Sequence, residues 1–314
     1  MRKIASSAIA CLLLGVYAAP AHAQPQPVPG QLARTFVSSM GNDANDCGRL
    51  TPCRTFQRAH DNTLPLGEIT VLDPGGYGAV NITKGISIIN DGVGEAGVLV
   101  SGGLIGITVN AGAFDRVTLR GLTVKGIGFG GGNGIRFNTA ASLSIENCVI
   151  RNHTGDGVQM LGNVSGVSTF TLSNTVVSDN GGNGIFIRPN GPSTLNVVLN
   201  GVEMYNNGAH GFAVIASEGR GVVATVTDSV SGGNGLSGFF SQAVMVVKRS
   251  LATSNADRGF LAETSATFLS DSVATLNGAE GWTGNRTVGI IFSYQDNLEY
   301  GNGGNSQSFP TNKK

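Results

Sequence analysis

The chain has 314 residues and a formal net charge of zero, because 20 basic residues balance 20 acidic ones. Proteins that bind nucleic acid usually carry a basic stripe, so this balance argues against a nucleic-acid partner. Glycine contributes 48 residues and charged residues only 13% of the chain, a composition that is typical of a turn-rich protein.

The first 23 residues have the pattern of a secretory signal. Residues 2–3 are basic, residues 4–19 form an apolar run, and residues 21–23 have the small-x-small pattern of a cleavage site. We therefore expect cleavage after Ala23 and a periplasmic or secreted mature protein. No later segment approaches the roughly 18 consecutive apolar residues of a membrane span, so no transmembrane segment is predicted in the mature chain.

Residues 24–33 contain three prolines, which predicts an extended linker. Residues 34–66 have a different pattern: a strand at Thr35 to Ser38, a polar turn, and a short helix from about Cys53 to His60. The repeats that follow must stack, and a stack of strands exposes unpaired edges at its ends. We predict that this strand and helix form an N-terminal cap.

Cys47 and Cys53 flank the polar turn of the predicted cap. In an exported protein a disulfide is the expected state. The alternative is a thiol or metal-binding pair, for which only His60 lies nearby. The turn sequence GNDAND (residues 41–46) has the alternating oxygen ligands of a calcium loop but lacks the later glutamate of an EF-hand. We expect an Asx-rich turn without metal or cofactor, with Ca²⁺ as the alternative.

A repeat begins after irregular early turns in residues 67–105. A glycine followed by a large apolar residue recurs at intervals of 21 to 28 residues: Gly106-Ile107, Gly134-Ile135, Gly157-Val158, Gly184-Ile185, Gly211-Phe212, Gly238-Phe239, Gly259-Phe260 and Gly281-Trp282. The apolar residues around it follow a two-residue period, which indicates strands and excludes a helical repeat. Units of this length cannot bury their own apolar faces, so they must stack.

Two polar columns accompany this motif. In the first, a polar residue lies between two aliphatic residues: Asn147, Asn174, Asn200, Asp228, Arg249 and Asp271. The second column is Asn152, Asn180, Asn207, Asn234, Asn255 and Asn277. In stacked turns, equivalent positions lie above one another, and a buried amide can bond to the amide or backbone of the next turn. We therefore expect asparagine ladders along the stack.

The Asn-x-x-Gly-apolar pattern of NGGNGIFIRPN (residues 180–190) and NNGAHGFAV (residues 206–214) resembles the pectate-lyase-like superfamily. This resemblance covers about residues 67–300. It implies an all-β fold, a single-stranded right-handed parallel β-helix, or solenoid, with a short N-terminal strand-plus-helix cap. We assign residues 67–302 to the β-helix and expect residues 303–314 to be a disordered tail. The superfamily includes lyases, hydrolases, epimerases, phage tail spikes and non-catalytic proteins, so the fold alone does not select a reaction.

Side chains of a strand point alternately to its two faces. The residue before each repeat glycine and the residues two and four positions after that glycine should therefore face outward. In the middle turns, these positions form the predicted wall: Arg136, Asp156, Asn183, Phe186, Arg188 and His210. Arginine, carboxylate, amide and an exposed aromatic ring suit the hydrogen bonding and ring stacking of a sugar chain. An ordinary polar solvent face is the favoured interpretation of this wall, and the alternative is a surface that binds a polysaccharide or cell-surface glycan as partner.

Catalysis requires more than this wall. Glycosidic hydrolysis uses two carboxyl groups about 5 to 10 Å apart, and Asp156 stands alone between Asn133 and Asn183. Polygalacturonase motifs are matched only in fragments, at residues 138–140, 155–157 and 209–211. A polysaccharide lyase needs a base together with a cation beside the uronate. The sequence offers arginines, but no evident acidic cluster to hold calcium.

The sequence therefore predicts an exported β-helix protein with a glycan-contacting or surface-structural role. No catalytic residue is assigned, and a non-catalytic role is favoured. The alternative is a polysaccharide lyase, epimerase or hydrolase acting on a uronate-type or other polysaccharide. His153 and His210 lie two turns apart and are expected to be polar surface residues rather than a metal site. The sequence pattern predicts no particular oligomeric state.

Overall fold

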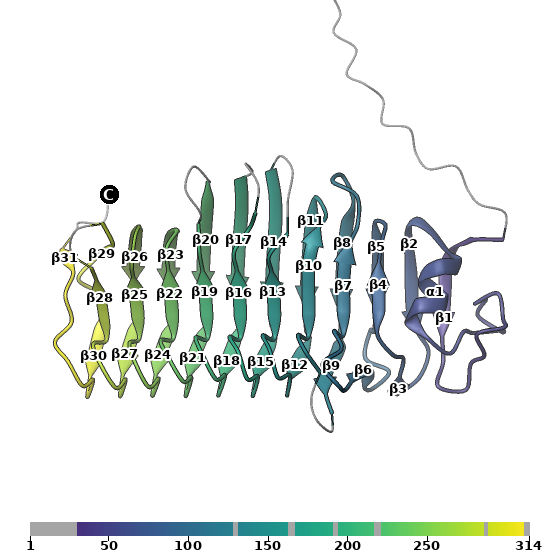
Figure 1. Cartoon of the computed structure of the whole chain (residues 1–314), viewed down its shortest axis with the longest axis horizontal. Coiled ribbons are helices and arrows are strands. Elements are labelled where there is room, and N and C mark those ends of the chain that lie inside the picture. Colours follow the sequence, from purple (N-terminus) through teal and green to yellow (C-terminus); the bar gives the residue numbers. More distant parts are fainter. Residues whose placement is uncertain are drawn as a thin grey trace, which may run out of the picture.

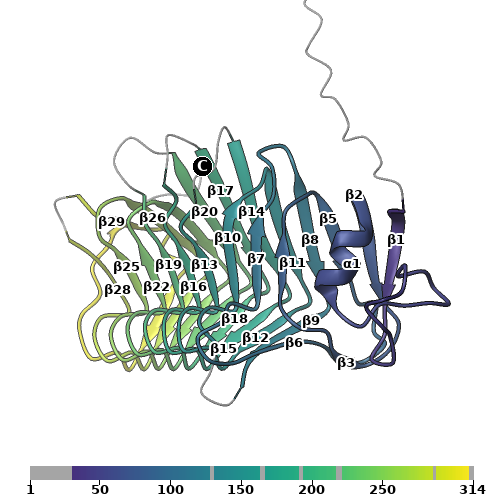
Figure 2. The same ribbon diagram turned by 45° about the vertical axis from the view of Figure 1, so that its right-hand side comes forward.

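The computed structural model describes residues 30–127, 131–162, 167–190, 194–216, 221–285 and 288–310. The predicted signal sequence, residues 24–29 of the predicted linker and residues 311–314 of the predicted tail lie outside this part of the chain. The described residues wind into a rod in which each regular turn contributes one strand to each of three parallel sheets (Figures 1 and 2). The predicted all-β solenoid is confirmed.

Sheet A contains the longest strands of the rod. Its order from the N-terminal end is β1 (Leu32–Val37), β2 (Thr63–Val71), β5 (Ile86–Ile89), β8 (Arg116–Arg120), β11 (Ser142–Glu146), β14 (Val167–Ser173), β17 (Thr194–Asn200), β20 (Val222–Thr227), β23 (Val244–Lys248), β26 (Ala266–Ser270), β29 (Ile290–Ser293) and β31 (Phe309–Pro310).

Sheet B runs along the lower edge of Figure 1. Its strands are β3 (Gly75–Gly76), β6 (Ala96–Val100), β9 (Leu122–Gly126), β12 (Val149–Arg151), β15 (Val176–Ser178), β18 (Glu203–Tyr205), β21 (Val230–Gly232), β24 (Leu251–Thr253), β27 (Val273–Thr275) and β30 (Leu298–Tyr300).

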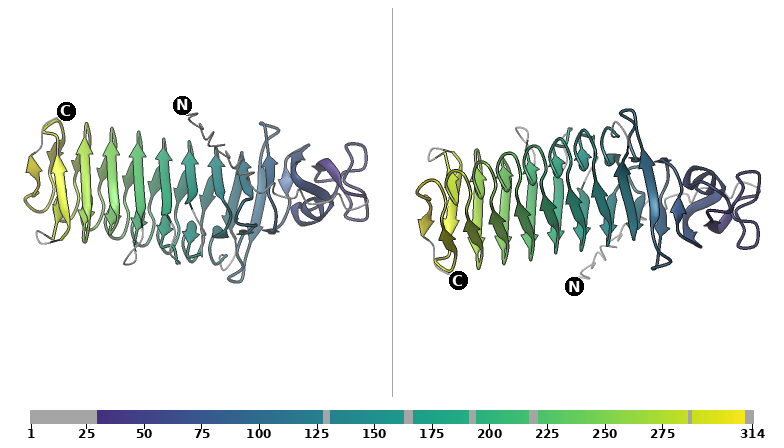
Figure 3. Two further views of the ribbon diagram at one scale, coloured as in Figure 1. Left: turned by 90° about the horizontal axis from the view of Figure 1, so that it is seen from above. Right: turned by 90° about the horizontal axis from the view of Figure 1, so that it is seen from below.

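Sheet C completes each turn. Its strands are β4 (Val80–Ile82), β7 (Ile107–Asn110), β10 (Ile135–Thr139), β13 (Val158–Met160), β16 (Ile185–Ile187), β19 (Phe212–Val214), β22 (Phe239–Ser241), β25 (Phe260–Ala262) and β28 (Trp282–Gly284). Figure 3 shows strands of successive turns lying side by side along the rod in both views.

The core is a set of apolar columns that run along the rod axis. The residues that follow the repeat glycines are paired in register through sheet C, and Ile185, Phe212 and Phe239 are fully buried. The rings of Phe239 and Phe260 stack with centroids 5.0 Å apart and planes 6° from parallel. Equivalent positions therefore lie above one another, as the repeat predicts.

A buried asparagine ladder lies at the corner between sheets B and C. The Nδ2 of Asn180 donates to Oδ1 of Asn207 over 3.0 Å, and Asn207 donates to Asn234 over 3.0 Å. The same bond continues through Asn255 and Asn277 to Asn302. Each Oδ1 also accepts the backbone N–H of the preceding ladder residue, as in the 3.1 Å bond from Asn207 N to Asn234 Oδ1. The ladder thus joins neighbouring turns through both side chain and backbone.

The ladder explains why the repeat motif contains glycine. A Cβ at Gly184 would lie 2.6 Å from the carbonyl oxygen of Gly211 and 2.9 Å from Nδ2 of Asn207. Real Cβ atoms do not approach other atoms this closely, so a side chain at Gly184 would push the next turn and its ladder residue away. The glycine is required by close approach between turns, because only a residue without Cβ fits there.

The predicted asparagine columns need two corrections of one residue. His153, and not Asn152, occupies the ladder position, because His153 N donates to Asn180 Oδ1 over 3.1 Å. Asn152 is the exposed residue before it, with φ of 61°. In the first column, Gly201, with φ of 62°, occupies the corner position that was predicted for Asn200. Asn200 still belongs to sheet A, where it pairs with Ser173. At both corners the left-handed residue directly precedes the ladder residue, and asparagine suits either place.

The corner between sheets A and B has a second ladder, built mainly from hydroxyl groups. The backbone N–H of Ser229 donates to Oγ of Ser250 over 3.2 Å, and Ser250 N donates to Ser272 Oγ over 3.3 Å. Cys148 occupies the equivalent place in an earlier turn, where its Sγ accepts from Leu122 N at 3.5 Å. The thiol is buried, and this burial raises its pKa to about 11.

The segment predicted as a cap extends the N-terminal end of the rod. Strand β1 adds to sheet A beside β2, and helix α1 (Phe56–Asn62) contacts β1, β2 and β4 (Figure 1). Its N-cap residue, Thr55, accepts a hydrogen bond from Arg58 N over 3.2 Å. The helix begins and ends slightly later than the predicted range of about Cys53 to His60. The predicted disulfide between Cys47 and Cys53 is confirmed, with their Cα atoms 4.6 Å apart.

The chain after Asn302 does not match the predicted disordered tail. Gly304 bridges to Glu280, and β31 pairs with β29 at the C-terminal end of sheet A. The segment lacks an apolar period, but backbone pairing with the last turn needs no such period. The prediction is therefore wrong for residues 303–310.

Removing one amide from the ladder should destabilise the rod. Asn207→Ala deprives the Asn180 side chain of its acceptor and the Val177 carbonyl of its Asn207 donor. Since leaving a buried polar group unsatisfied costs about 1 to 3 kcal/mol, we expect a loss of about 2 to 4 kcal/mol in the free energy of unfolding. Urea unfolding followed by circular dichroism measures it.

Asn196→Ala is the matched control, because Asn196 lies on the exposed face of β17 in the same turn. Its free energy of unfolding should change by less than about 0.5 kcal/mol. Equal losses in the two variants would contradict a stabilising role for the ladder.

Candidate functional site

The predicted wall coincides with the corner that leads into sheet C and with the outer face of that sheet. At the corner, Asp156 Oδ1 accepts from the backbone N and from Nδ2 of Asn183, over 2.8 and 2.9 Å. In the next turn, Asn183 Oδ1 accepts from His210 N over 3.2 Å. His210 Nδ1 then accepts from Ser237 N over 3.1 Å. These side chains form a third ladder between turns.

This ladder corrects the prediction that residues before the repeat glycines face outward. Asn133 and Asp156 are only 6% and 7% exposed, and Ser237 is fully buried. The two-residue alternation of a strand does not continue through a corner, where each side chain turns along the axis to reach the next backbone N–H. Asp156, Asn183 and His210 therefore each accept a backbone N–H of the following turn, while Asn183 and His210 stay partly exposed.

The outer face of sheet C carries the remaining wall. The pairing of β10, β13, β16, β19 and β22 places Arg136, Gln159, Phe186, Ala213 and Phe240 in one outward column. Ala213 is only 1% exposed although it belongs to this outward column. Its neighbours in the column are Phe186 and Phe240, both half-buried, so the three side chains make an apolar patch.

A polar network borders this patch on its N-terminal side. Gln159 Oε1 accepts from Asn133 Nδ2 over 2.8 Å and from Arg136 Nε over 3.2 Å, and its Nε2 donates to Asp156 Oδ2 over 2.7 Å. Gln159 thus links the outward arginine to the corner ladder. The structure brings Arg136 and Asp156 together through Gln159, which the predicted wall omitted although the column pattern already placed it there.

His210 connects the corner ladder to the aromatic patch. Its ring stacks on Phe240 with centroids 4.7 Å apart and planes 25° from parallel. Burial lowers the pKa of His210, against the opposing effects of its bond to Ser237 and of nearby Asp257 and Glu263. The Nδ1 atom accepts a backbone hydrogen bond, so the neutral ring carries its proton on Nε2. Phe240 also belongs to the site but was absent from the predicted wall.

Arg188 lies at the edge of this surface. It follows β16, its side chain is exposed, and its backbone N donates to Met160 O over 2.8 Å. At the corner that leads into sheet C, two turns after His210, Arg258 binds Glu280 and Asp257 through nitrogen–oxygen contacts of 2.8 and 2.9 Å. Asp156 has an amide residue on either side in its own ladder, so the described residues place no acid pair for hydrolysis there.

Histidines and acidic residues do not form a recognisable metal centre in the described part of the chain. His153 is buried, its Nε2 lies 3.3 Å from Val124 O, and its Nδ1 has no hydrogen-bond partner among the described residues. Within the same residues, no group of three or more His, Cys, Asp or Glu is arranged to hold a metal ion. In the turn considered for calcium, Asp43 accepts from the backbone of Arg54 and Thr55 and Asp46 from that of Gly48.

Hollows large enough for small ligands lie elsewhere on the rod. One lies at the C-terminal end, one beside α1, and two at corners near Asn90 and Pro74. None of these four is lined by a residue of the predicted wall, so the wall is an open surface rather than one of these pockets. Over the described residues, no helix has the length and apolar character needed to cross a membrane.

The burial of His153 predicts a loss of stability in acid. Burial lowers its pKa in the folded chain, whereas the unfolded ring takes up a proton near its ordinary value of 6.5. The resulting stability is fully present above about pH 6.5 and decreases as the pH falls below it. In His153→Asn, which retains a ladder side chain, the free energy of unfolding should decline less between about pH 7 and about pH 5 than in the parent chain.

Thr154→Ala is the control for this measurement. It removes the 2.7 Å bond from Thr154 Oγ1 to Gly131 O but no titrating group. We expect it to lower the stability by a similar amount at both pH values. An unchanged acid slope in His153→Asn would show that His153 does not contribute to the pH dependence.

Comparisons with known proteins agree with this architecture. The model of a protein family described as "right handed beta helix region" matches residues 105–297 of this chain. A search of curated proteins found no match. Among solved structures, the chain is similar to pectate lyase Pel9A, with a TM-score of 0.62, 16% identity, and coverage of 87% of this chain and 78% of that one.

A second similar structure is the A-module of the Azotobacter vinelandii mannuronan C-5 epimerase AlgE4, with a TM-score of 0.47 and 16% identity. That comparison covers 80% of this chain and 90% of the epimerase module. At 16% identity the pectate lyase structure establishes a shared fold and no shared chemistry. Because the sequence match spans more than half of its length, the chain belongs to the right-handed β-helix family.

Proposed function

We propose that this protein binds a polysaccharide along the outer face of sheet C without cleaving it. The observation that carries the proposal is the outward column in which Phe186 and Phe240 flank Ala213, with Arg136 and Gln159 in the two preceding turns. The proposal includes export, supported by the signal-like sequence and the disulfide.

The spacing of the two phenylalanines suits an extended ligand. Neighbouring strands lie about 4.8 Å apart, so residues two turns apart, such as Phe186 and Phe240, are separated by about 10 Å along the axis. Pyranose rings have apolar C–H faces and hydroxyl edges. Aromatic side chains give a large contact area, and the two rings can contact successive parts of one chain that follows the rod.

Arg136 makes acidic glycans the favoured ligands. Its Nε donates to Gln159, while the guanidinium has five N–H donors in all, so further donors remain for a ligand. Arginine pairs with carboxylates through two parallel hydrogen bonds, which gives both affinity and orientation. A uronate-containing chain could therefore place a carboxylate at Arg136 and apolar ring faces against Phe186.

The similarity to a pectate lyase supports a test for polysaccharide turnover as the alternative function. The shared fold supports a solenoid surface that can accommodate a long chain, but fold does not determine chemistry. On the described wall, Asp156 is engaged by Gln159 and Asn183, and no second acid lies in its neighbouring ladder positions. Binding without cleavage is the function that this geometry supports best.

The aromatic patch can be tested by removing each ring separately. Phe186→Ala and Phe240→Ala should each weaken binding to a uronate polymer about fivefold to tenfold, because each removes roughly 1 to 1.4 kcal/mol of contact. Affinity electrophoresis and calorimetry with uronate and neutral polymers give the dissociation constants. Val198→Ala is the control, since Val198 faces outward on sheet A away from this patch.

The same incubations should show no turnover, measured as ultraviolet absorbance of unsaturated ends and as reducing ends. Absence of binding to every polymer in the panel would contradict the proposal. Turnover that is lost in Arg136→Ala would replace it with a lyase or hydrolase function on the same surface.

A further inference from the structure

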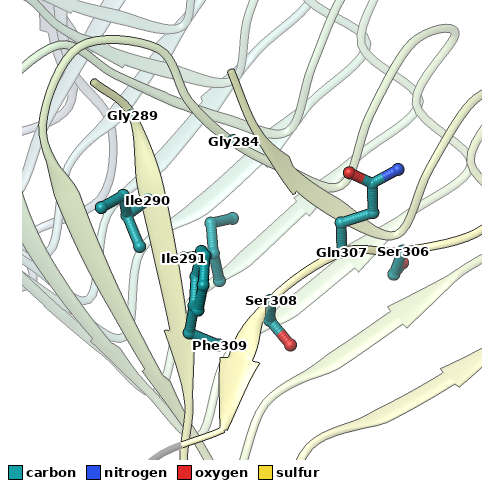
Figure 4. A pocket seen from close by; sticks show the side chains of 8 residues that line it. All are labelled: Gly284, Gly289, Ile290, Ile291, Ser306, Gln307, Ser308 and Phe309. Atoms are coloured by element: carbon teal, nitrogen blue, oxygen red, sulfur yellow. The ribbon is translucent and has the colours of Figure 1, made fainter. Parts of the chain in front are cut away.

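The C-terminal end of the rod contains a pocket of about 430 Å³. It lies between the ends of β28 and β29 and the segment leading into β31 (Figure 4). One side is formed by Ile290 and Ile291, and the other by Ser306, Gln307, Ser308 and Phe309. Its volume lies within the range of about 300 to 1,000 Å³ that small-molecule sites occupy.

The described part of the pocket lining is amphipathic. Ile290 and Phe309 supply apolar surface, and Ser306 and Ser308 supply hydroxyl groups, whereas Ile291 is only 1% exposed. Ser306 Oγ accepts from Trp282 N over 3.0 Å, which holds this part of the segment against the last strand of sheet C. Among the described residues that line the pocket, none is acidic or basic, and the polar groups that they present suit the hydroxyl groups of an uncharged ligand.

An aromatic stack on the outer face of sheet A ends at this pocket. The rings of Phe268 and Phe292 are stacked, with centroids 5.1 Å apart and planes 14° from parallel. Phe309 follows Phe292 at 6.4 Å but is tilted by 46°. Phe309 is 54% exposed and belongs to the last strand of sheet A in the described chain. Because no further strand covers it there, its ring is open to a ligand.

The size of the apolar surface argues against a second copy of the chain as occupant. The stack and its outward neighbours Val246 and Ile290 extend over roughly four turns, or about 20 Å, and about two side-chain columns in width. Such a strip offers roughly 250 Å², while a stable protein interface buries about 800 Å² on each partner. A small ligand fits these dimensions better.

We propose that this pocket binds one neutral sugar residue at the end of a glycan chain. The apolar face of the ring contacts Phe309 and Ile290, and its hydroxyl groups bond to the side chains of Ser306 and Ser308. The site goes beyond the proposed function: it lies on another part of the rod and selects uncharged sugars, whereas Arg136 favours acidic ones. A glycan with both kinds of sugar could use both surfaces.

The proposal is tested with the full chain and defined saccharides. The probes are glucose, galactose and their neutral tetrasaccharides, with galacturonate oligomers as the acidic comparison. Saturation-transfer NMR and calorimetry should detect the neutral sugars, and Phe309→Ala should weaken their binding at least about tenfold, which corresponds to about 1.4 kcal/mol. Phe309→Trp should retain binding, because it keeps an aromatic face.

Val198→Ala is the matched control, because it removes apolar surface from an outward position of sheet A on β17, five strands before β31, and should leave the affinity for neutral saccharides unchanged. Melting temperatures show whether Phe309→Ala still folds, and Ser308→Ala provides a second, milder change in the same lining. Absence of binding by any neutral saccharide overturns the proposal, as does binding that is unaffected by both Phe309→Ala and Ser308→Ala. Loss of uronate binding in Phe186→Ala with intact neutral-sugar binding would separate the two sites.

Discussion

The structure depends on hydrogen bonds from backbone N–H groups at the corners to polar side chains of a neighbouring turn. Where the chain leaves a sheet, some backbone donors have no carbonyl partner in a neighbouring turn. A buried donor without an acceptor costs about 1 to 3 kcal/mol. The bonds from Asn207 N to Asn234 and from Asn183 N to Asp156 remove this cost between sheets B and C, and the bond from Ser229 N to Ser250 removes it between sheets A and B.

This requirement decides which polar residues remain for binding. A carboxylate, an amide and an imidazole at Asp156, Asn183 and His210 look like a set of ligand contacts, but each accepts a backbone N–H from the following turn. Their recurrence is a property of the stack. Outward polar residues within a strand, such as Arg136 and Gln159, do not accept a backbone N–H from a neighbouring turn. Ligand contacts are therefore expected at outward strand positions.

The accuracy of the sequence-based prediction follows the same division. The inward column that contains Ile185, Phe212 and Phe239 could be predicted because a strand has a strict period of two and stacking preserves it. The corners could not, because a left-handed residue and a ladder residue are adjacent there and asparagine is favourable at both. The ladder position was therefore predicted for Asn152, although His153 occupies it. Phe186 and Arg136 were placed correctly on the outer face, whereas the period of two failed for Asp156 because its position lies at a corner.

The outer faces differ in chemistry because stacking constrains them less than the interior. An inward substitution must fit the columns above and below it, but an outward one changes mainly the surface. Along sheet A, this freedom gives charged Arg116 and Arg120 on β8 and aromatic Phe268 and Phe292 four or more strands later. Sheet C carries Arg136 and Gln159 ahead of its phenylalanines. A single interior pattern can therefore support outer surfaces of different chemistry, because an outward side chain can be exchanged without changing the inward columns that the turns share.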